Sequence, residues 1–92
     1  MLAFDLTDGL KLRMRKLAHK DRPLLEILRK KMREIVSNDA KTASSRYKNL
    51  RQDLQGLKRV HVDRHFVLTF RVGEAKSFVL FMDFDHHDKV YR

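Results

Sequence analysis

The sequence is short and strongly basic: 92 residues carry 21 Lys and Arg against 12 Asp and Glu, a net charge of +9. That length allows one domain, and a hydrophobic fraction of 42% with three Gly and one Pro excludes a disordered or low-complexity chain. Cysteine is absent, which excludes disulfides, thiolate metal sites and cysteine nucleophiles, and no apolar run approaches the roughly 20 residues that span a bilayer. We therefore expect a single cytoplasmic domain over residues 1–92, without a membrane segment.

The basic excess is uneven along the chain. Residues 1–56 hold 14 basic and 7 acidic side chains, whereas residues 57–92 hold 7 and 5. A positive field of this size favours a polyanion or an acidic protein as the partner, and charge alone does not choose between the two.

The start of the chain is predicted to form a short strand and a helix. Apolar residues alternate with others over residues 2–6, which is the period of a half-buried strand. A helix then begins at Thr7 or Asp8, because either side chain can accept a hydrogen bond from a free N–H group of the first turn. This helix ends near His19. Its apolar face consists of Leu10, Met14 and Leu17.

A second helix is predicted to follow and to pack against the first as an antiparallel hairpin. It begins at Asp21, with Pro23 in the first turn, where the missing N–H of proline costs no hydrogen bond. The polar residues 37–39 mark its end. Its apolar stripe contains Leu24, Leu25, Ile27, Leu28, Met32, Ile35 and Val36.

Residues 39–55 carry a weaker pattern that leaves two interpretations open. Ser44 and its polar neighbours are typical of a loop, whereas apolar residues at helical spacing from Tyr47 to Leu54 favour a turn or two of helix. Gly56 marks the start of a sheet.

Three strands are predicted over residues 58–62, 66–72 and 78–84, with a hairpin turn at residues 73–76. Because one face of this sheet is apolar and can cover the helices, the predicted fold class is α+β, with an N-terminal helix hairpin packed on one face of a small antiparallel sheet. The residues expected on the apolar side are Lys58, Val60, Val62, Phe66, Leu68, Phe70, Val72, Phe78, Leu80, Met82 and Phe84. The residues expected on the outer side are Arg59, His61, Val67, Thr69, Arg71, Val79, Phe81 and Asp83.

The outer face and its flanking segments collect arginine, histidine and tyrosine without a serine or cysteine nucleophile pattern. These residue types suit RNA cleavage without a metal, in which the 2′-hydroxyl attacks its own phosphate. Histidine can move the protons, arginine can bind phosphate, and tyrosine can stack on a base. The residues concerned are Arg59, His61 and Arg71 on the face, Arg64 and His65 in the preceding loop, and His86, His87 and Tyr91 at the C-terminus.

Each of these residues also has a structural interpretation. Arg59 and Arg71 on an outer strand face often serve solubility alone, and Tyr91 can anchor the C-terminus by packing its ring. His86 and His87 can cap backbone groups at the end of a strand.

A metal site is a further alternative, because carboxylates and imidazoles are concentrated between Asp83 and Asp88. Adjacent side chains on an extended strand point to opposite faces, so His86 and His87 do not bind one ion unless the backbone turns there. We therefore expect neither a metal nor another cofactor.

Two segments of the chain are similar to a known family. Residues 54–62, Leu-Gln-Gly-Leu-Lys-Arg-Val-His-Val, and residues 86–91, His-His-Asp-Lys-Val-Tyr, resemble the RelE/ParE superfamily of toxins from type II toxin–antitoxin modules, in particular its archaeal RelE-like members. The order of the predicted elements is also that of the family: a strand, a helix hairpin, a polar loop, the strand that begins after Gly56, and a hydrophobic hairpin. The resemblance therefore covers nearly the whole chain. It implies a RelE-like fold and a cytoplasmic toxin that enters the ribosomal A site and cuts mRNA, neutralised by an acidic antitoxin that wraps around it.

The resemblance also implies roles for particular residues. Family members often carry an arginine after an aromatic residue where this chain has Phe66 and Val67. The phosphate-binding role of that arginine is therefore either vacant in this chain or passes to Arg64, His65 or Arg71. By position, the predicted catalytic residues are Arg59, His61, Arg64, His86, His87 and Tyr91, and the predicted RNA-binding residues are Lys58, His65 and Arg71.

Three functions therefore remain open. The leading hypothesis is a ribosome-dependent endoribonuclease whose partners are the ribosome, mRNA and an acidic antitoxin. A ParE-like inhibitor of DNA gyrase is the second, although it would need a binding surface rather than proton carriers. The third is a catalytically inert protein that binds RNA or an acidic partner, which the missing arginine at Val67 favours.

Overall fold

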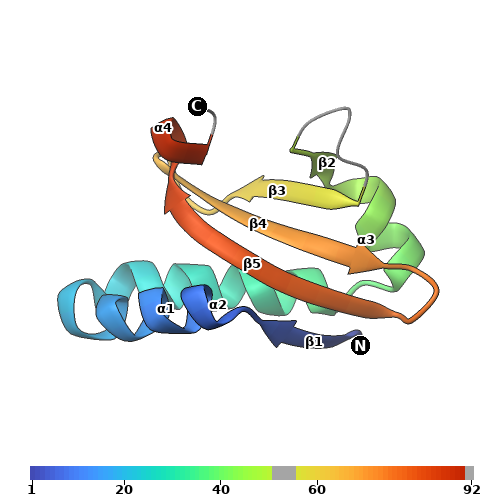
Figure 1. Ribbon diagram of the computed structural model, residues 1–92, viewed down its shortest axis with the longest axis horizontal. Coiled ribbons are helices and arrows are strands. Elements are labelled where there is room, and N and C mark those ends of the chain that lie inside the picture. The colour runs from blue at the N-terminus through green and yellow to red at the C-terminus, as the bar shows by residue number, and fades with distance from the viewer. Residues whose placement is uncertain (51–55, 91–92) are drawn as a thin grey trace.

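The structure is a computed structural model that describes residues 1–50 and 56–90. In Figure 1, the helices α1 and α2 lie side by side along one face of a curved sheet, and α4 lies at one end of that sheet. The predicted α+β class, with an N-terminal helix hairpin packed on one sheet face, is confirmed. The elements in chain order are β1 (Ala3–Leu6), α1 (Asp8–Lys20), α2 (Arg22–Val36), α3 (Ala40–Arg46), β2 (Lys48–Asn49), β3 (Leu57–His61), β4 (Phe66–Gly73), β5 (Phe78–His86) and α4 (His87–Val90).

The sheet has the strand order β1-β5-β4-β3-β2, in which β1 runs parallel to β5 and the other neighbours are antiparallel. Thr7 fixes the position of β1. Its N–H donates to the Phe81 carbonyl at 3.0 Å, and its hydroxyl donates to the Met82 carbonyl at 2.6 Å. The predicted first strand is thereby confirmed, and within the described residues it forms one edge of the sheet.

Both long helices begin at the predicted caps. Thr7 Oγ1 accepts a hydrogen bond from Leu10 N at 3.2 Å, and Asp21 Oδ1 accepts one from Leu24 N at 3.1 Å. Ile27 departs from the predicted stripe of α2, since it is 44% exposed. Successive residues of an α-helix are about 100° apart around its axis, so Ile27 points away from the core that buries the next residue, Leu28. The buried stripe consists of Leu24, Leu25, Leu28, Met32, Ile35 and Val36.

The segment that the sequence left open between a loop and a helix contains α3 and β2. Asp39 caps α3, because its carboxylate accepts a hydrogen bond from Thr42 N at 2.7 Å. That hydrogen bond lowers the pKa of Asp39 below its ordinary value. Tyr47 follows α3 and makes a T-shaped contact with Phe70, with ring centroids 5.4 Å apart. The predictions for residues 51–55 lie outside the described residues.

A β-bulge changes the faces predicted for the last strand. Thr69 pairs with Asp83, but its neighbour Phe70 pairs with Phe81, so Met82 is an extra residue in β5. One extra residue reverses the alternation, and the side chains before the bulge therefore change faces. The prediction was wrong for five residues: Val79 and Phe81 are fully buried, whereas Phe78, Leu80 and Met82 are only partly buried.

The hydrophobic core fills the space between the sheet and the two long helices. Its largest fully buried side chains are Phe70, Phe81 and Phe84, which meet Leu28 and Ile35 from α2. Complete burial of one such side chain stabilises the fold by roughly 1.5–3 kcal/mol, so this core holds the strands in a fixed register. Of the helices in residues 1–50 and 56–90, none has the length and apolar character needed to cross a membrane.

Candidate functional site

Four of the five histidines meet at one end of the sheet. β3 ends at His61, β4 begins at Phe66 and β5 ends at His86, and antiparallel pairing places these ends together. The imidazoles form two stacks, which we call the histidine cluster. His61 stacks on His87 with ring centroids 5.6 Å apart and planes inclined by 28°. His65 stacks on His86 at 5.8 Å and 4°.

The turn before β4 is held by Asp63. Its Oδ1 accepts hydrogen bonds from His65 N at 2.8 Å and from Phe66 N at 3.0 Å. Val62 N also donates to the Phe66 carbonyl at 3.0 Å. Carboxylate bonds of this kind satisfy free N–H groups and fix the backbone of a turn. Arg64 and His65 therefore project from an ordered turn.

The helix α4 completes the cluster. His87 N donates to the His65 carbonyl at 2.6 Å, and the carboxylate of Asp88 lies 3.6 Å from Nδ1 of both His86 and His87. The backbone N–H of Asp88 also donates to His86 Nδ1 at 3.3 Å. A neutral imidazole that accepts this N–H carries its proton on Nε2, whereas a protonated one pairs with the carboxylate. Asp88 therefore supplies a partner to both protonation states of His86.

An ion pair connects the cluster to the helix layer. Arg13 Nη2 on α1 lies 3.4 Å from Asp85 Oδ2, and the Asp85 side chain is only 17% exposed. The other carboxylate oxygen, Oδ1, accepts a hydrogen bond from His86 N at 2.7 Å. Asp85 therefore holds the backbone of a cluster residue and α1 at the same time.

Two of the predicted arginines lie near the cluster. Arg59 is on the outer face of β3, two residues before His61 and therefore roughly 7 Å from it along the strand. Arg64 is exposed in the turn beside His65. Guanidinium groups at these positions can reach a phosphate held at the histidines.

The structure does not bring Lys58 or Arg71 to the cluster. Lys58 lies on the helix side of the sheet, as its alternation predicted. It is 7% exposed, and its Nζ donates to Asn49 Oδ1 at 2.7 Å. Arg71 is exposed on the outer face, but it lies four residues along β4 from Val67, a distance of roughly 13 Å. Tyr91 lies outside the described residues.

Val67 is fully buried at the position where the resemblance expects an arginine. It is 0% exposed and pairs with His61 on one side and Asp85 on the other. A charged side chain here would lack access to water unless its surroundings moved. Val67 therefore contributes to the packing of the sheet beside the histidine cluster.

Three carboxylates of the site were not among the predicted functional residues. Asp63, Asp85 and Asp88 each hold a histidine of the cluster or its backbone. Each stands within two residues of a histidine in the sequence, which is a signal that could have identified them. Within residues 1–50 and 56–90, no three His, Cys, Asp or Glu side chains are grouped so that they could hold a metal ion.

Two solved structures share the fold. The metal-bound toxin from Helicobacter pylori has a TM-score of 0.74, with 14% identity over 97% of this chain and 98% of that one. YafQ from E. coli strain BL21(DE3) has a TM-score of 0.72, with 15% identity over 100% of both chains. At these identities the likeness establishes the fold alone.

Two proteins from archaea are closer in sequence. A protein of Methanocaldococcus jannaschii with the name "Putative toxin RelE4" is 46% identical over 79 residues, which cover 86% of this chain and 79% of that protein. A protein of Methanosarcina mazei is 47% identical over 76 residues, or 83% of each chain. No protein-family model matches the sequence. This chain belongs to the RelE-like toxins of toxin–antitoxin systems, a family that implies an antitoxin as partner.

Proposed function

We propose that this toxin is an endoribonuclease that cleaves mRNA on the ribosome in the cytoplasm, with the histidine cluster as its active site. The observation that supports this proposal is the stacking of two imidazole pairs beside Arg64. Two adjacent imidazoles can supply a proton acceptor and a proton donor near neutral pH, and a guanidinium can bind the phosphate between them.

The reaction would use the 2′-hydroxyl of the RNA as its nucleophile. One imidazole of the His61–His87 pair accepts the proton of that hydroxyl as its oxygen attacks the phosphorus. The other imidazole, already protonated, donates its proton to the leaving 5′-oxygen. The P–O bond to that oxygen breaks, and the products are a 2′,3′-cyclic phosphate and a 5′-hydroxyl. Both histidines are exposed, so an RNA strand can reach them.

The neighbouring residues would bind and orient the RNA. Arg59 and Arg64 stabilise the negative charge that grows on the phosphate oxygens. The rings of His65 and His86 are more nearly parallel than those of His61 and His87, and they offer a surface on which a base can stack. Tyr91 remains a predicted stacking residue or hydrogen-bond donor.

The charge of the chain supports both proposed partners. A net charge of +9 attracts the polyanionic RNA of the ribosome and the messenger, and it also attracts an acidic antitoxin. Because the excess is greatest in residues 1–56, the helical half would supply most of the long-range field.

A catalytically inert binding protein of the same fold is the second candidate, and one observation favours it. Val67 is buried and apolar where relatives often carry an arginine, so one group expected to stabilise the transition state is absent from that position. ParE-like inhibition of DNA gyrase would need no proton carriers and can be examined with the same purified protein.

The experiment that tests the proposal adds the purified protein to translating ribosomes and maps new mRNA 5′ ends. We expect ends in phase with codons, and a loss of about 10²- to 10⁴-fold in cleavage rate for His61→Ala or His87→Ala. His19→Ala is the matched control, because His19 is an exposed histidine at the end of α1.

The other outcomes separate the alternatives. Intact mRNA with impaired DNA supercoiling would indicate a gyrase inhibitor. Intact mRNA with RNA binding that weakens steeply with salt would indicate an inert binder, because phosphate contacts release counterions. Cleavage that persists after Arg59, His61, His86 and His87 are all changed to Ala would show that the active site lies elsewhere.

A further inference from the structure

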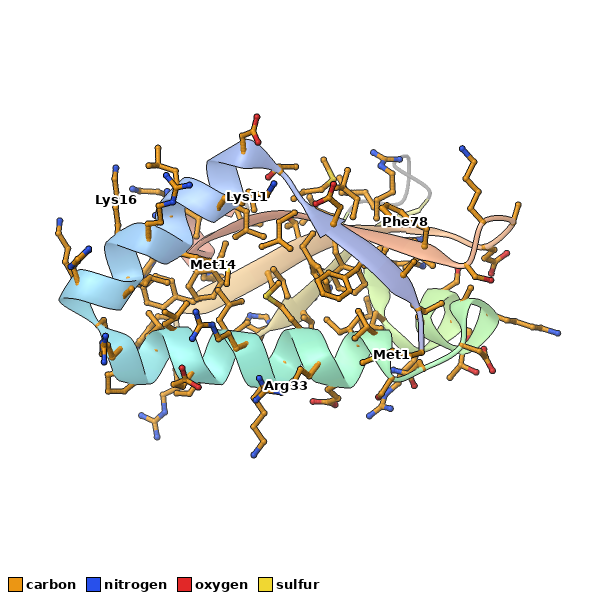
Figure 2. The ribbon with its side chains drawn as sticks, turned by 90° about the horizontal axis from the view of Figure 1, so that it is seen from below. Met1, Lys11, Met14, Lys16, Arg33 and Phe78 are labelled. Atoms are coloured by element: carbon orange, nitrogen blue, oxygen red, sulfur yellow. The ribbon has the colours of Figure 1, made fainter. Side chains whose placement is uncertain are left out.

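A hollow of 450 Å³ opens at the end of the sheet where β3 begins and β4 ends. This end is opposite the histidine cluster: in Figure 1, α3 lies at the one end and α4 at the other. Figure 2 shows the same region from the helix side, with α3 beyond the end of α2. We call this hollow the lysine hollow. It is lined by Ser44 from α3, Asn49 from β2, and Gly56, Lys58, Val72 and Glu74.

The buried charge in the lysine hollow is Lys58. It is 7% exposed, and among residues 1–50 and 56–90 no other charged residue is buried. Strand pairing places it between Asn49 of β2 and Phe70 of the core. Its Nζ donates to Asn49 Oδ1 at 2.7 Å, and no carboxylate of the described residues forms an ion pair with it. Because a buried ammonium group is costly without a compensating anion, an anion that enters the hollow binds favourably beside Lys58.

Hydrogen-bond donors from three segments surround the hollow. An ammonium group carries three N–H donors, and Asn49 accepts only one of those of Lys58. Since the oxygen of the Asn49 amide accepts that bond, the nitrogen of the same amide remains a donor. Ser44 adds a hydroxyl group from α3. A phosphate group presents three or more acceptor oxygens to such a set, whereas a carboxylate presents two, so the donors favour a phosphate.

The charges near the hollow also favour an anion. Arg71 lies at the same end of the sheet, on its outer face, and a Cβ atom added at Gly56 would lie 3.9 Å from Arg71 Nη1. Lys58 and Arg71 are the two predicted RNA-binding residues that the structure places away from the histidine cluster. Glu74 lines the hollow as well, but it is exposed, and water and salt screen an exposed carboxylate. Two cations and one screened carboxylate leave the hollow attractive to an anion.

We propose that the lysine hollow binds a phosphate group, held by the ammonium group of Lys58, the amide nitrogen of Asn49 and the hydroxyl of Ser44. The phosphate is either free inorganic phosphate or the terminal phosphate of a nucleotide. Once bound, it connects α3, β2 and β3, so its binding free energy stabilises the fold. The inference does not depend on the proposed function, because no residue of the hollow belongs to the histidine cluster. RNA cleavage and phosphate binding in the hollow can therefore fail separately.

A titration of the intact protein with inorganic phosphate tests the proposal. The amide signals of ¹⁵N-labelled protein are followed at constant ionic strength, with chloride as the balancing anion. We expect saturable shifts at Ser44, Asn49 and Gly56 with a dissociation constant of about 1 mM or below, and a rise in the midpoint of thermal unfolding. Phosphate can also bind at the histidine cluster, so only the signals of these three residues report on the hollow. Shifts that do not saturate, or that acetate produces equally, would overturn the proposal.

Two substitutions remove the site in different ways. Lys58→Met deletes the charge and keeps an unbranched apolar chain, and it should weaken phosphate binding in the hollow at least about tenfold. Asn49→Asp places a carboxylate where the oxygen that accepts from Lys58 Nζ now lies. This internal anion should raise the midpoint of thermal unfolding without phosphate and abolish the response to phosphate. If Lys58→Met does not fold, Asn49→Asp decides alone, and a wild-type response in that variant would contradict the proposal.

Matched controls separate the site from general attraction by charge. Lys48→Met removes the same charge at an exposed neighbouring position in β2, and it should leave affinity within about twofold. Equal losses in Lys48→Met and Lys58→Met would show that the hollow itself does not bind phosphate. Glu74→Gln should tighten binding by about twofold or more, because it removes a repelling carboxylate.

Adenosine 5′-monophosphate distinguishes the two sources of the phosphate group. Tighter binding of the nucleotide than of inorganic phosphate, with an added shift at Val72, would assign the hollow to a nucleotide. Weaker binding would assign it to free phosphate.

Discussion

The histidine cluster and the lysine hollow are built in opposite ways. The cluster stacks imidazoles from the ends of β3 and β5, the turn before β4, and α4, whereas the hollow surrounds one buried ammonium group with side chains from α3, β2 and β4. In Figure 1, α4 and α3, which adjoin these two regions, lie at opposite ends of the sheet. Under the two proposals, one basic molecule presents a site for a polyanion and a separate site for a single phosphate group.

The largest predicted effect is that substitutions in each region impair one activity and leave the other unchanged. His61→Ala with His87→Ala should lower mRNA cleavage by at least about 10²-fold while phosphate binding in the lysine hollow stays unchanged. Asn49→Asp should weaken phosphate binding in the hollow at least about tenfold while cleavage of a ribosome-bound messenger continues. Both activities are measured on the same preparations. If either variant lost both activities while it remained folded, the two regions would not be independent.

The next effect concerns the position where the family arginine is missing. Because Val67 is 0% exposed, Val67→Arg should lower the free energy of unfolding by roughly 3 kcal/mol. Denaturant titration measures this change. A variant of unchanged stability that cleaves mRNA faster would instead show that the buried position can open and accept a catalytic arginine.

A smaller effect is expected where α1 meets the histidine cluster. Arg13→Ala removes the ion pair with the largely buried Asp85 and should cost about 1 kcal/mol, since the arginine side chain is 41% exposed. Lys16→Ala, at an exposed position on the same helix, is the control. Asp85 also holds His86 N, so cleavage should fall modestly with the first variant alone. A zero coupling energy in a double-mutant cycle of Arg13→Ala and Asp85→Asn would contradict the connection.

The smallest predicted effects are changes in stability at two glycines outside the histidine cluster. Gly56 has a φ of 84° at the start of β3, so Gly56→Ala should destabilise the protein by about 1 kcal/mol. Gly9 lies in α1, and no atom lies within 4 Å of an added Cβ. Gly9→Ala should therefore stabilise by roughly 0.5–1 kcal/mol. Thermal unfolding measures both changes in stability. A change in the same direction in both variants would contradict this prediction.

The sequence allowed prediction of the features that depend only on residues close together in the chain. Thr7 and Asp21 cap their helices because a cap needs only its own first turn. The bulge at Met82 was missed, since it depends on how β5 pairs with β4. The parallel pairing of β1 with β5 was missed for the same reason, because it joins the two ends of the chain.

The candidate site shows the same division. The histidines were predicted as proton carriers from their residue type, and the resemblance to RelE-like toxins placed His61, His86 and His87 at positions that the family uses. Their pairing into two stacks depends on the turn that Asp63 holds and on the fold of α4, neither of which has a periodic pattern. Arg71 was predicted to bind RNA because it shares a face with Arg59, but position along the strand separates it from the histidines.

The most direct test of the central claim is the chemistry of the cleaved ends. The protein is incubated with programmed ribosomes, and the two ends of each cut are identified by enzymatic labelling and mass spectrometry. We expect a 2′,3′-cyclic phosphate, or the 3′-phosphate formed from it, upstream and a 5′-hydroxyl downstream, in the wild type and the His19→Ala control but not in His87→Ala. A 5′-phosphate with a 3′-hydroxyl would contradict the central claim, because attack by the 2′-hydroxyl cannot produce those ends.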